Sequence, residues 1–416
     1  MQTAPRPLGR GERAPDFVLA GQDGTPTRFY AHAGGRPAVL LFYDADGVDD
    51  LLRFAAALSD GADSAVALFV VQRGTPAMPP QVFSGRARRF LVFADPQGTV
   101  RTAYCPGATD PPPLFVLDPN LRVLASLVLQ DAAATAHQVL ALLDACLPPV
   151  APLEITTPAP VLLIPDALDQ ELCQALIHVW ETQGHVATGV EQSRGARRAA
   201  TLNLAHKRRR DHTVRDAPLL HQLASTIGRR VLPEVSKAFA FRATRFEGFT
   251  IACYDAATGG FFRAHRDNLS PATAHRRFAL SLNLNAGYAG GYLRFPEYGP
   301  HLYRPAAGGA LVFACSHLHE VTEVRQGRRF VLLSFLFGAG ESRPRRHHGN
   351  GSPRHRRTRR PRVSCRSPWR TGPARCWTVG RQARDPPPVR SGCKEPAGLQ
   401  DACNHGAPGG ESPAAA

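Results

Sequence analysis

In the stretch Phe278-Ala-Leu-Ser-Leu-Asn-Leu-Asn285, large apolar side chains alternate with Ala279, Ser281, Asn283 and Asn285. Because successive side chains of a strand point to opposite faces, this pattern predicts a strand with one apolar and one polar face. Such a strand favours a barrel whose polar face lines a cavity. Asn283 and Asn285 are then candidates to bind a co-substrate or water in that cavity, and a solvent-facing edge strand is the alternative.

Three side chains around this strand form a candidate metal site. His265 and Asp267 are two residues apart in extended sequence, so their side chains share a face and can converge on one ion. His319 follows the apolar run 309–314 and supplies a third ligand from a distant strand. Two imidazoles and one carboxylate on one side of a ferrous ion leave the opposite positions open, as in non-haem Fe(II) oxygenases.

Arg329 follows His319 by ten residues and opens the last apolar run of this region. A guanidinium there suits two-point pairing with a carboxylate, so a dicarboxylate is predicted to bind the iron at one end and Arg329 at the other. His317 is a rival third ligand because it shares a strand face with His319. A zinc site at Cys315, His317 and His319 is not favoured, since no Cys-x-x-Cys accompanies them.

The surrounding sequence contains further motifs, which are Tyr254-Asp255, Gly259-Gly-Phe-Phe262, Arg276-Arg-Phe278, Gly290-Gly291, Phe295-Pro-Glu-Tyr-Gly299 and Gly308-Gly-Ala-Leu-Val-Phe313. With them, residues 152 to 338 resemble the 2-oxoglutarate and Fe(II)-dependent dioxygenases of the prolyl 4-hydroxylase-like group. The resemblance implies a double-stranded β-helix, or jelly-roll, with flanking helices. It also implies that decarboxylation of 2-oxoglutarate is coupled to hydroxylation of a substrate by dioxygen, with L-ascorbate as a rescuing reductant.

The resemblance assigns roles to single residues. It implies that His265, Asp267 and His319 are the iron ligands, that Arg329 binds the C5 carboxylate of 2-oxoglutarate, and that Tyr254 is a second contact to the co-substrate. Asn283 is the third candidate contact to 2-oxoglutarate, from its place on the polar strand face. The presence of Asp267, where alanine or glycine would open a halide position, favours hydroxylation over halogenation.

Helical patterns precede these strands. Residues 166–181 and 216–239 carry apolar side chains at helical spacing, and Pro233 is expected to bend or end the second helix. Between them lies the basic cluster Lys207-Arg-Arg-Arg210, within a segment, 184–210, that is predicted to face the substrate. A solvated loop is the plainer interpretation of the cluster, and a contact to an anionic substrate or a nucleic-acid phosphate is the alternative.

The first 150 residues have a different organisation. Apolar runs at 39–43, 65–71, 90–93, 114–117 and 122–127 alternate with helical stretches at 48–58 and 132–147, which predicts an α/β layer fold. From Gly11-Glu-Arg-Ala-Pro-Asp-Phe17 onward, residues 9 to 147 resemble peroxiredoxin-like members of the thioredoxin superfamily. The peroxidatic cysteine of such enzymes is missing, because Asp44-Ala-Asp-Gly-Val-Asp-Asp50 stands in its place. The domain is therefore predicted to be redox-inactive and to serve in docking or as a homodimer contact.

Composition sets limits on the remaining properties. Nine cysteines without framework spacing favour a reducing compartment, and no apolar stretch approaches the roughly 20 residues that cross a bilayer. We therefore expect a cytoplasmic protein with no membrane partner. Three parts are predicted, which are a thioredoxin-like domain at 1–150, the dioxygenase domain at 151–340 and a disordered basic tail at 341–416.

The tail carries most of the formal charge of +16, with sixteen of the 50 basic residues and only five of the 34 acidic ones. It is rich in proline and glycine and has little to bury. Two interpretations remain, a basic arm that binds RNA, DNA or acidic membrane surfaces, or a frame-shifted extension, and the second is preferred. Nucleic acid is not favoured as a partner except through this tail.

The sequence thus predicts a hydroxylase of amino-acid side chains, of the prolyl type, or of a small metabolite. The two alternatives are a non-catalytic scaffold with a vestigial metal site and a nucleic-acid binder.

Overall fold

The computed structural model describes residues 6–44, 48–60, 66–73, 90–107, 113–148, 151–152, 154–188, 190–194, 197–201 and 203–340. The predicted tail at 341–416 and part of the acidic loop that follows Asp44 lie outside the described residues. Within the described residues, no helix is both long and apolar enough to cross a membrane.

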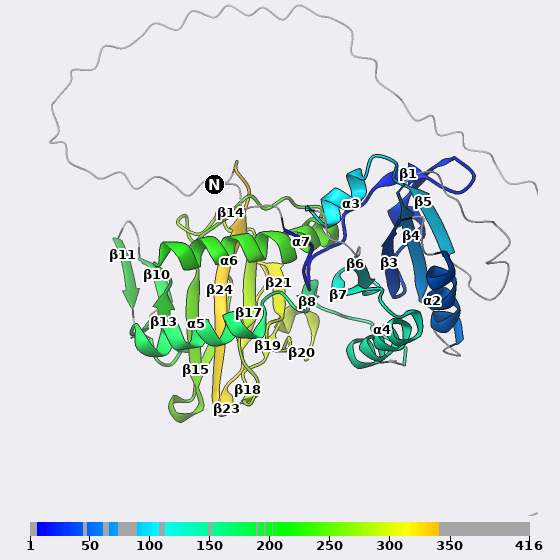
Figure 1. Ribbon diagram of the computed structural model, residues 1–416. Coiled ribbons are helices and arrows are strands. Elements are labelled where there is room, and N and C mark those ends of the chain that lie inside the picture. The colour runs from blue at the N-terminus through cyan, green and yellow to red at the C-terminus, as the bar shows by residue number, and fades with distance from the viewer. Residues whose placement is uncertain are drawn as a thin grey trace, which may run out of the picture. The chain divides into compact units, whose positions relative to one another are not determined.

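The amino-terminal part is a seven-stranded mixed sheet with helices (Figure 1). Its strands run β2-β1-β5-β4-β3-β6-β7, where β3, β4 and β5 are parallel and β6 and β7 are antiparallel to their neighbours. The bounds are β1 Val18–Ala20, β2 Pro26–Arg28, α1 Phe29–His32, β3 Ala38–Tyr43, α2 Val48–Asp60, β4 Ala67–Gln72, β5 Phe90–Ala94, α3 Thr99–Tyr104, β6 Pro113–Leu117, β7 Val123–Val128 and α4 Ala132–Cys146. The predicted alternation of strands and helices is confirmed, and the likeness to the thioredoxin superfamily stays a prediction.

Helices α2 and α4 lie on the same face of this sheet (Figure 1). They contribute Leu51, Phe54, Val139 and Leu143 to a core with Val39 and Leu41 of β3. The opposite sheet face packs aromatic rings, among them Phe42 and Phe69, which point away from the two helices. Every residue of β3 and β4 is buried, as expected for central strands covered on both faces.

The second part contains two antiparallel sheets and three helices. The eight-stranded sheet runs β8-β21-β17-β24-β15-β13-β9 with β14 beside β24, and the five-stranded sheet runs β12-β16-β22-β19-β20. The strand bounds are β8 Val161–Ile164, β9 Val186–Ala187, β10 Val190–Arg194, β11 Arg197–Thr201, β12 Lys207–Arg208, β13 Arg210–Thr213, β14 Arg245–Phe246, β15 Thr250–Asp255, β16 Phe261–His265, β17 Phe278–Asn283, β18 Ala289–Gly290, β19 Leu293–Arg294, β20 Leu302–Tyr303, β21 Ala310–Ala314, β22 His319–Val321, β23 Val324–Gln326 and β24 Arg328–Phe337. Two two-stranded sheets, the hairpin β10–β11 and the pair β18–β23, complete the strands.

The helices are α5 Gln170–Thr182, α6 Ala217–Arg230 and α7 Leu232–Phe239, and short 3₁₀ turns lie at Ala256–Thr258 and Pro296–Tyr298. Asp169 and Asp216 cap α5 and α6 by accepting hydrogen bonds from Leu172 N and Leu219 N. The second predicted helix divides at Val231, just before Pro233, so the expected break is confirmed.

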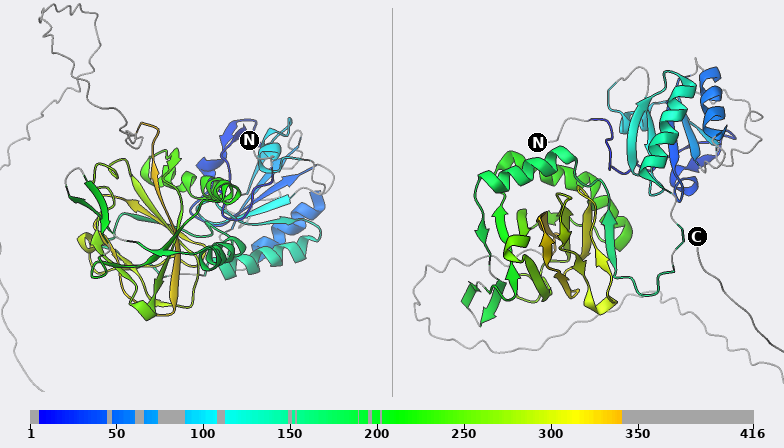
Figure 2. Two further views of the ribbon diagram at one scale, coloured as in Figure 1. Left: turned by 90° about the vertical axis from the view of Figure 1, so that its left-hand side faces the viewer. Right: turned by 90° about the horizontal axis from the view of Figure 1, so that it is seen from below.

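Strand β17 explains how the two sides of the large sheet differ. Leu280 and Leu282 pack into the core that α5, α6 and α7 cover on one face (Figure 2). Ala279 and Ser281 point the other way, toward a cavity between the two sheets. The period-two prediction is therefore confirmed, and the edge-strand alternative is wrong because β17 lies between β21 and β24. Two facing antiparallel sheets are consistent with the predicted jelly-roll.

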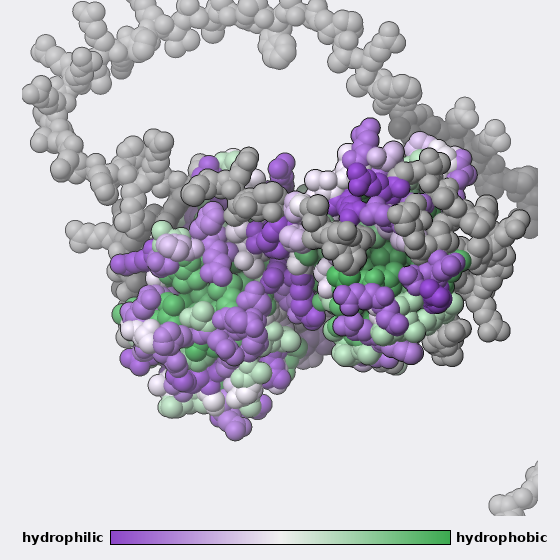
Figure 3. Space-filling view, viewed as in Figure 1, coloured by the Kyte–Doolittle hydropathy of each residue, from purple (hydrophilic) through white to green (hydrophobic). Residues whose placement is uncertain are grey.

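Contacts of the amino-terminal segment reach helix α7. Arg13 makes two hydrogen bonds to the carboxylate of Glu234, at 2.9 and 2.6 Å, and Asn120 donates to the same carboxylate at 2.6 Å. The side chains of Arg13 and Glu234 are 11% and 4% exposed. Buried Arg122 also donates to the carbonyl oxygen of Pro165, ahead of α5. These polar contacts join the two parts. Figure 3 shows that hydrophilic residues cover much of the visible surface.

Candidate metal centre and cavity

His265, Asp267 and His319 meet because of strand register. His265 ends β16 and His319 begins β22, and the two residues face each other as partners in the antiparallel ladder. Asp267 lies two residues beyond His265, where its backbone N–H donates to the carbonyl oxygen of Cys315 and holds the segment beside the end of β21. The pairing of β16 with β22 places His265 opposite His319, and the two-residue step to Asp267 brings the third side chain to the same place.

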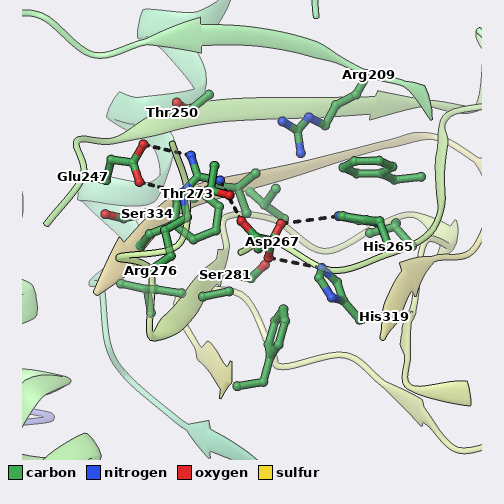
Figure 4. A pocket seen from close by; sticks show the side chains of 18 of the residues that line it. Arg209, Glu247, Thr250, His265, Asp267, Thr273, Arg276, Ser281, His319 and Ser334 are labelled. Atoms are coloured by element: carbon green, nitrogen blue, oxygen red, sulfur yellow. Dashed lines mark hydrogen bonds and ion pairs between the residues drawn. The ribbon is translucent and has the colours of Figure 1, made fainter. Parts of the chain in front are cut away.

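The three side chains form a compact donor set (Figure 4). Oδ1 of Asp267 is 3.5 Å from Nε2 of His265, and Oδ2 is 3.4 Å from Nε2 of His319. One ligand atom from each residue lies within 4.8 Å of the others, which suits a shared metal ion. Among the described residues, this is the one group of three or more His, Cys, Asp or Glu side chains with that property.

The backbone fixes the orientation of both imidazoles. Nδ1 of His265 lies 2.8 Å from the carbonyl oxygen of Arg263, and Nδ1 of His319 lies 3.0 Å from that of His317. A carbonyl oxygen only accepts, so Nδ1 carries the proton and the Nε2 lone pair faces Asp267. Second partners of this kind orient metal-binding histidines in proteins.

Burial favours the protonation states that bind a metal. Desolvation lowers the pKa of His319 to about 4, and this outweighs the opposite effect of Asp267. Desolvation alone would raise the pKa of Asp267, but its interactions with His265 and the nearby His319 outweigh it and lower the pKa. These shifts favour neutral imidazole at His319 and carboxylate at Asp267, the forms that act as ligands.

Arg329 and Tyr254 line the same cavity, which has a volume of about 720 Å³. Arg329 is 2% exposed, and its buried Nε atom has no hydrogen-bond partner among the described residues. Its guanidinium carbon lies 5.4 Å from the centre of the Tyr254 ring. Gly291, at φ 63°, leaves room for this side chain, because a Cβ there would lie 2.9 Å from Cδ of Arg329.

Asn283 does not reach the cavity. Its side-chain amide donates to the carbonyl oxygens of Asn285 and Pro305, at 3.0 and 3.1 Å, and its oxygen accepts from the Tyr288 hydroxyl at 2.9 Å. The Asn285 side chain bonds the backbone of Ala286, Arg328 and Phe330. The expected contact of Asn283 with 2-oxoglutarate finds no support in this geometry, because these amides close turns at the end of β17.

His317 stands apart from the donor set. Its ring packs near Tyr298, at 5.3 Å between centres, and its Nδ1 is buried without a hydrogen-bond partner among the described residues. Neither His317 nor Cys315 lines the cavity. The preference for His319 as the third member agrees with this arrangement, and the zinc alternative is not supported.

The prediction of a solvated loop at 207–210 is wrong for two of its four residues. Lys207 is 6% exposed, Arg209 is half-buried, and both line the cavity, whereas Arg208 and Arg210 are exposed. Lys207 belongs to β12 of the small sheet and Arg210 begins β13 of the large one, so Arg209 lies where the chain crosses between sheets. Strand alternation within the basic run was the signal that would have identified them.

The other end of the cavity holds a second ion pair that the sequence did not reveal. Glu247 accepts two hydrogen bonds from Arg276, at 2.6 and 2.8 Å, and Nε2 of His275 lies 3.1 Å from the same carboxylate. The Arg276 guanidinium also lies over the Phe335 ring at 3.8 Å. In Figure 4 this pair lies to the left of Asp267, whereas Arg209 lies above it toward the right.

The amino-terminal part shows an unreactive thiol environment. Cys105 is buried, and desolvation raises its pKa to about 11, so the thiolate form is rare at neutral pH. Asp44, at the start of the acidic loop, pairs with Arg101 at 2.7 Å. The raised pKa of Cys105 agrees with the prediction that this domain is redox-inactive.

Comparison with known proteins gives one match to a family model. Residues 249–337 match the 2OG-Fe(II) oxygenase superfamily, a range that contains the His-Asp-His set, Tyr254 and Arg329. The chain contains a 2OG-Fe(II) oxygenase domain. The protein is therefore an enzyme, and Fe(II) and 2-oxoglutarate are the cofactors that the superfamily implies. No curated protein sequence matches the chain significantly.

Several solved structures are similar to part of the chain. A prolyl-4-hydroxylase from Pseudomonas putida is 18% identical, over 43% of this chain and 94% of that chain, with a TM-score of 0.34. A prolyl hydroxylase from Trichoplax adhaerens, in complex with a hypoxia inducible factor oxygen degradation domain peptide fragment, is 15% identical over 44% and 84%, with a TM-score of 0.36. A 2OG-Fe(II) oxygenase family oxidoreductase from Burkholderia pseudomallei is 19% identical over 42% and 84%, with a TM-score of 0.31.

Proposed function

We propose that this protein is an Fe(II)- and 2-oxoglutarate-dependent dioxygenase that hydroxylates an amino-acid side chain, of the prolyl type, or a small metabolite. His265, Asp267 and His319 would hold the iron, and Arg329 would bind the far carboxylate of 2-oxoglutarate. When bound, these cofactors supply the oxidising chemistry together with dioxygen. By the family resemblance, L-ascorbate would sustain turnover.

One observation carries this proposal. The three-residue donor set and a buried arginine with an unsatisfied Nε face the same cavity. A buried cation without a partner is costly, whereas a carboxylate ligand would supply the missing hydrogen bonds in a planar, two-point contact. The donor set and Arg329 therefore fit a molecule with a metal-binding end and a carboxylate end.

The chain's own residues would prepare the site in three ways. The carbonyl oxygens of Arg263 and His317 hold the imidazoles with Nε2 toward the ion. Tyr254 is buried beside Arg329, and its hydroxyl accepts a hydrogen bond from Arg209 at 3.2 Å. Apolar side chains, among them Leu293 and Phe313, exclude water from the walls next to His319.

An anaerobic titration with Fe(II) and 2-oxoglutarate tests the proposal. We expect the metal-to-ligand absorption band of a bound 2-oxoglutarate–iron pair in the wild type and in His221→Ala, which changes an exposed histidine of α6. The band should be lost in His265→Ala. A wild-type protein that binds both components without this band, and forms no succinate in air, would instead favour the non-catalytic scaffold.

A further inference from the structure

One end of the cavity concentrates positive charge. Lys207, Arg209 and Arg329 all line it there, around Tyr254 and Phe262. Phe262 stacks on His265, with 3.6 Å between ring centres, so this cationic end adjoins the donor set directly.

Lys207 and Arg209 share one acidic partner. Arg209 makes two bonds of 2.7 Å to the carboxylate of Asp211, and Nζ of Lys207 lies 3.7 Å from the same group. Nζ also donates to the Thr188 hydroxyl at 2.7 Å and lies 5.2 Å from the centre of the Phe262 ring. These contacts aim both cations at the cavity and hold them rigidly.

The other two arginines of the cavity wall each have an acidic partner of their own. Arg266 has Glu297 as its own partner, and Arg276 has Glu247. At the cationic end, Lys207 and Arg209 share the carboxylate of Asp211. Asp267, a proposed iron ligand, also raises the pKa of Lys207, and Arg329 is the proposed partner of the co-substrate. The cationic end therefore keeps positive charge beyond what 2-oxoglutarate would neutralise.

Stability does not explain a lysine in this position. Burial, followed by the nearby charge of Arg209, lowers the pKa of Lys207 to about 7, which shows that the folded protein destabilises its charged form. A buried ammonium that costs stability and faces a reaction cavity is typical of a binding group. An anionic ligand beside it would restore the charged form.

We propose that Lys207 and Arg209 form a subsite for a carboxylate of the primary substrate, distinct from the Arg329 site for 2-oxoglutarate. This inference rests on the proposed function and narrows it to carboxylic acids, such as free or amino-terminally blocked amino acids, rather than residues inside a peptide chain. The opposite end, where Glu247 neutralises Arg276, would receive the uncharged part of the molecule.

The lysine content of the chain makes a direct test possible. The sequence has three lysines, Lys207, Lys237 and Lys394, and Lys237 is exposed on α7. The full-length protein, loaded anaerobically with Fe(II) and 2-oxoglutarate, is acetylated with limiting acetic anhydride at pH 8. Peptide mass spectrometry then gives the labelling rates of Lys207 and Lys237 in the same sample.

The probes are two carboxylate and amide pairs, propionate with propionamide and N-acetylglycine with N-acetylglycinamide. We expect at least one carboxylate to slow acetylation of Lys207 fivefold or more at saturation, while its amide and the Lys237 rate show no change. If neither carboxylate protects Lys207, or if the amides protect equally, the subsite does not exist. Protection by 2-oxoglutarate alone would assign Lys207 to the co-substrate and would also overturn the proposal.

Substitution gives an independent measurement. Calorimetric titration of the protecting carboxylate should show at least a tenfold weaker affinity in Lys207→Met, with affinity largely kept in Lys207→Arg and unchanged in Lys237→Met. Equal affinity in Lys207→Met and the wild type would contradict the assignment. The absorption band is recorded in every sample and separates the two proposals. Loss of the band while a carboxylate still protects Lys207 would reject the oxygenase function alone. An intact band without protection of Lys207 would reject the subsite alone.

Discussion

Nδ1 of His319 lies 3.0 Å from the backbone carbonyl oxygen of His317. The His319 ring therefore contacts the main chain of His317 and not its imidazole. The ring of His317 makes no contact with the cavity. We therefore expect His319→Ala to weaken Fe(II) binding by at least 100-fold, because one of the three proposed ligands is lost, while His317→Ala changes it less than threefold. Anaerobic equilibrium dialysis against Fe(II) measures both, and the reverse order would make His317 the ligand.

Arg329 and Arg328 are neighbours with opposite surroundings. Arg329 is buried against the cavity, whereas Arg328 pairs with Glu181 on the surface, where the two side chains are 47% and 40% exposed. Removing a buried partner of a carboxylate costs about 3 kcal/mol, or roughly 100-fold in affinity. We expect Arg329→Met to raise the half-saturating concentration of 2-oxoglutarate by that factor, and Arg328→Met to leave it unchanged. Titration of the absorption band checks both variants, and equal effects would remove Arg329 from the co-substrate site.

The buried lysine predicts a pH-dependent stability. The pKa of Lys207 is about 7 in the folded protein, against an ordinary value of 10.5. Between these values the unfolded chain binds a proton that the folded protein has lost, so the contribution of Lys207 to the free energy of unfolding rises with pH. Lys207→Met should be more stable than the wild type at pH 6, and its advantage should shrink by up to about 1.4 kcal/mol per pH unit above pH 7. Urea denaturation of both proteins at pH 6, 7.5 and 9 measures this, and a constant difference would contradict it.

The ion pair between Arg13 and Glu234 links residues that are far apart in sequence. Both side chains are almost fully buried, so Glu234→Ala leaves a buried guanidinium without its carboxylate. Loss of one partner from a buried pair costs roughly 3 kcal/mol. We expect this loss in denaturant unfolding followed by circular dichroism, and no measurable change in Arg53→Ala, which breaks an exposed pair with Asp50. A Glu234→Ala protein as stable as the wild type would show that the pair does not hold the two parts together.

Local sequence pattern predicted much of the fold and of the donor set. Alternation identified β17 and its cavity face, and Pro233 marked the break between α6 and α7, because each depends on residues within a few positions. His265 and Asp267 were identified from their separation of two residues, and ladder register then placed His319 opposite His265. These features follow from strand geometry alone.

Sequence pattern carries little information where side chains choose between partners that are distant in sequence. Asn283 lies on the same strand face as Ala279 and Ser281, which point to the cavity. Its side-chain amide is instead hydrogen-bonded to Tyr288 and Pro305 at the end of β17. Arg276 carries a charge whose effect depends on Glu247, twenty-nine residues earlier. No periodicity encodes such pairings, since they depend on how the loops pack after the sheets form.

The thiol of Cys105 gives a final prediction about the amino-terminal part. Desolvation raises its pKa to about 11, so at pH 8 only a small fraction is thiolate, which is the reactive form. Cys146, at the end of α4, is only half-buried. Iodoacetamide at pH 8 should therefore label Cys146 at least tenfold faster than Cys105 in the native protein, and the two rates should converge in urea because unfolding exposes both thiols. Peptide mass spectrometry over a time course measures the rates. Rapid native labelling of Cys105, or consumption of hydrogen peroxide that Cys105→Ser abolishes, would show that this part of the protein retains redox chemistry.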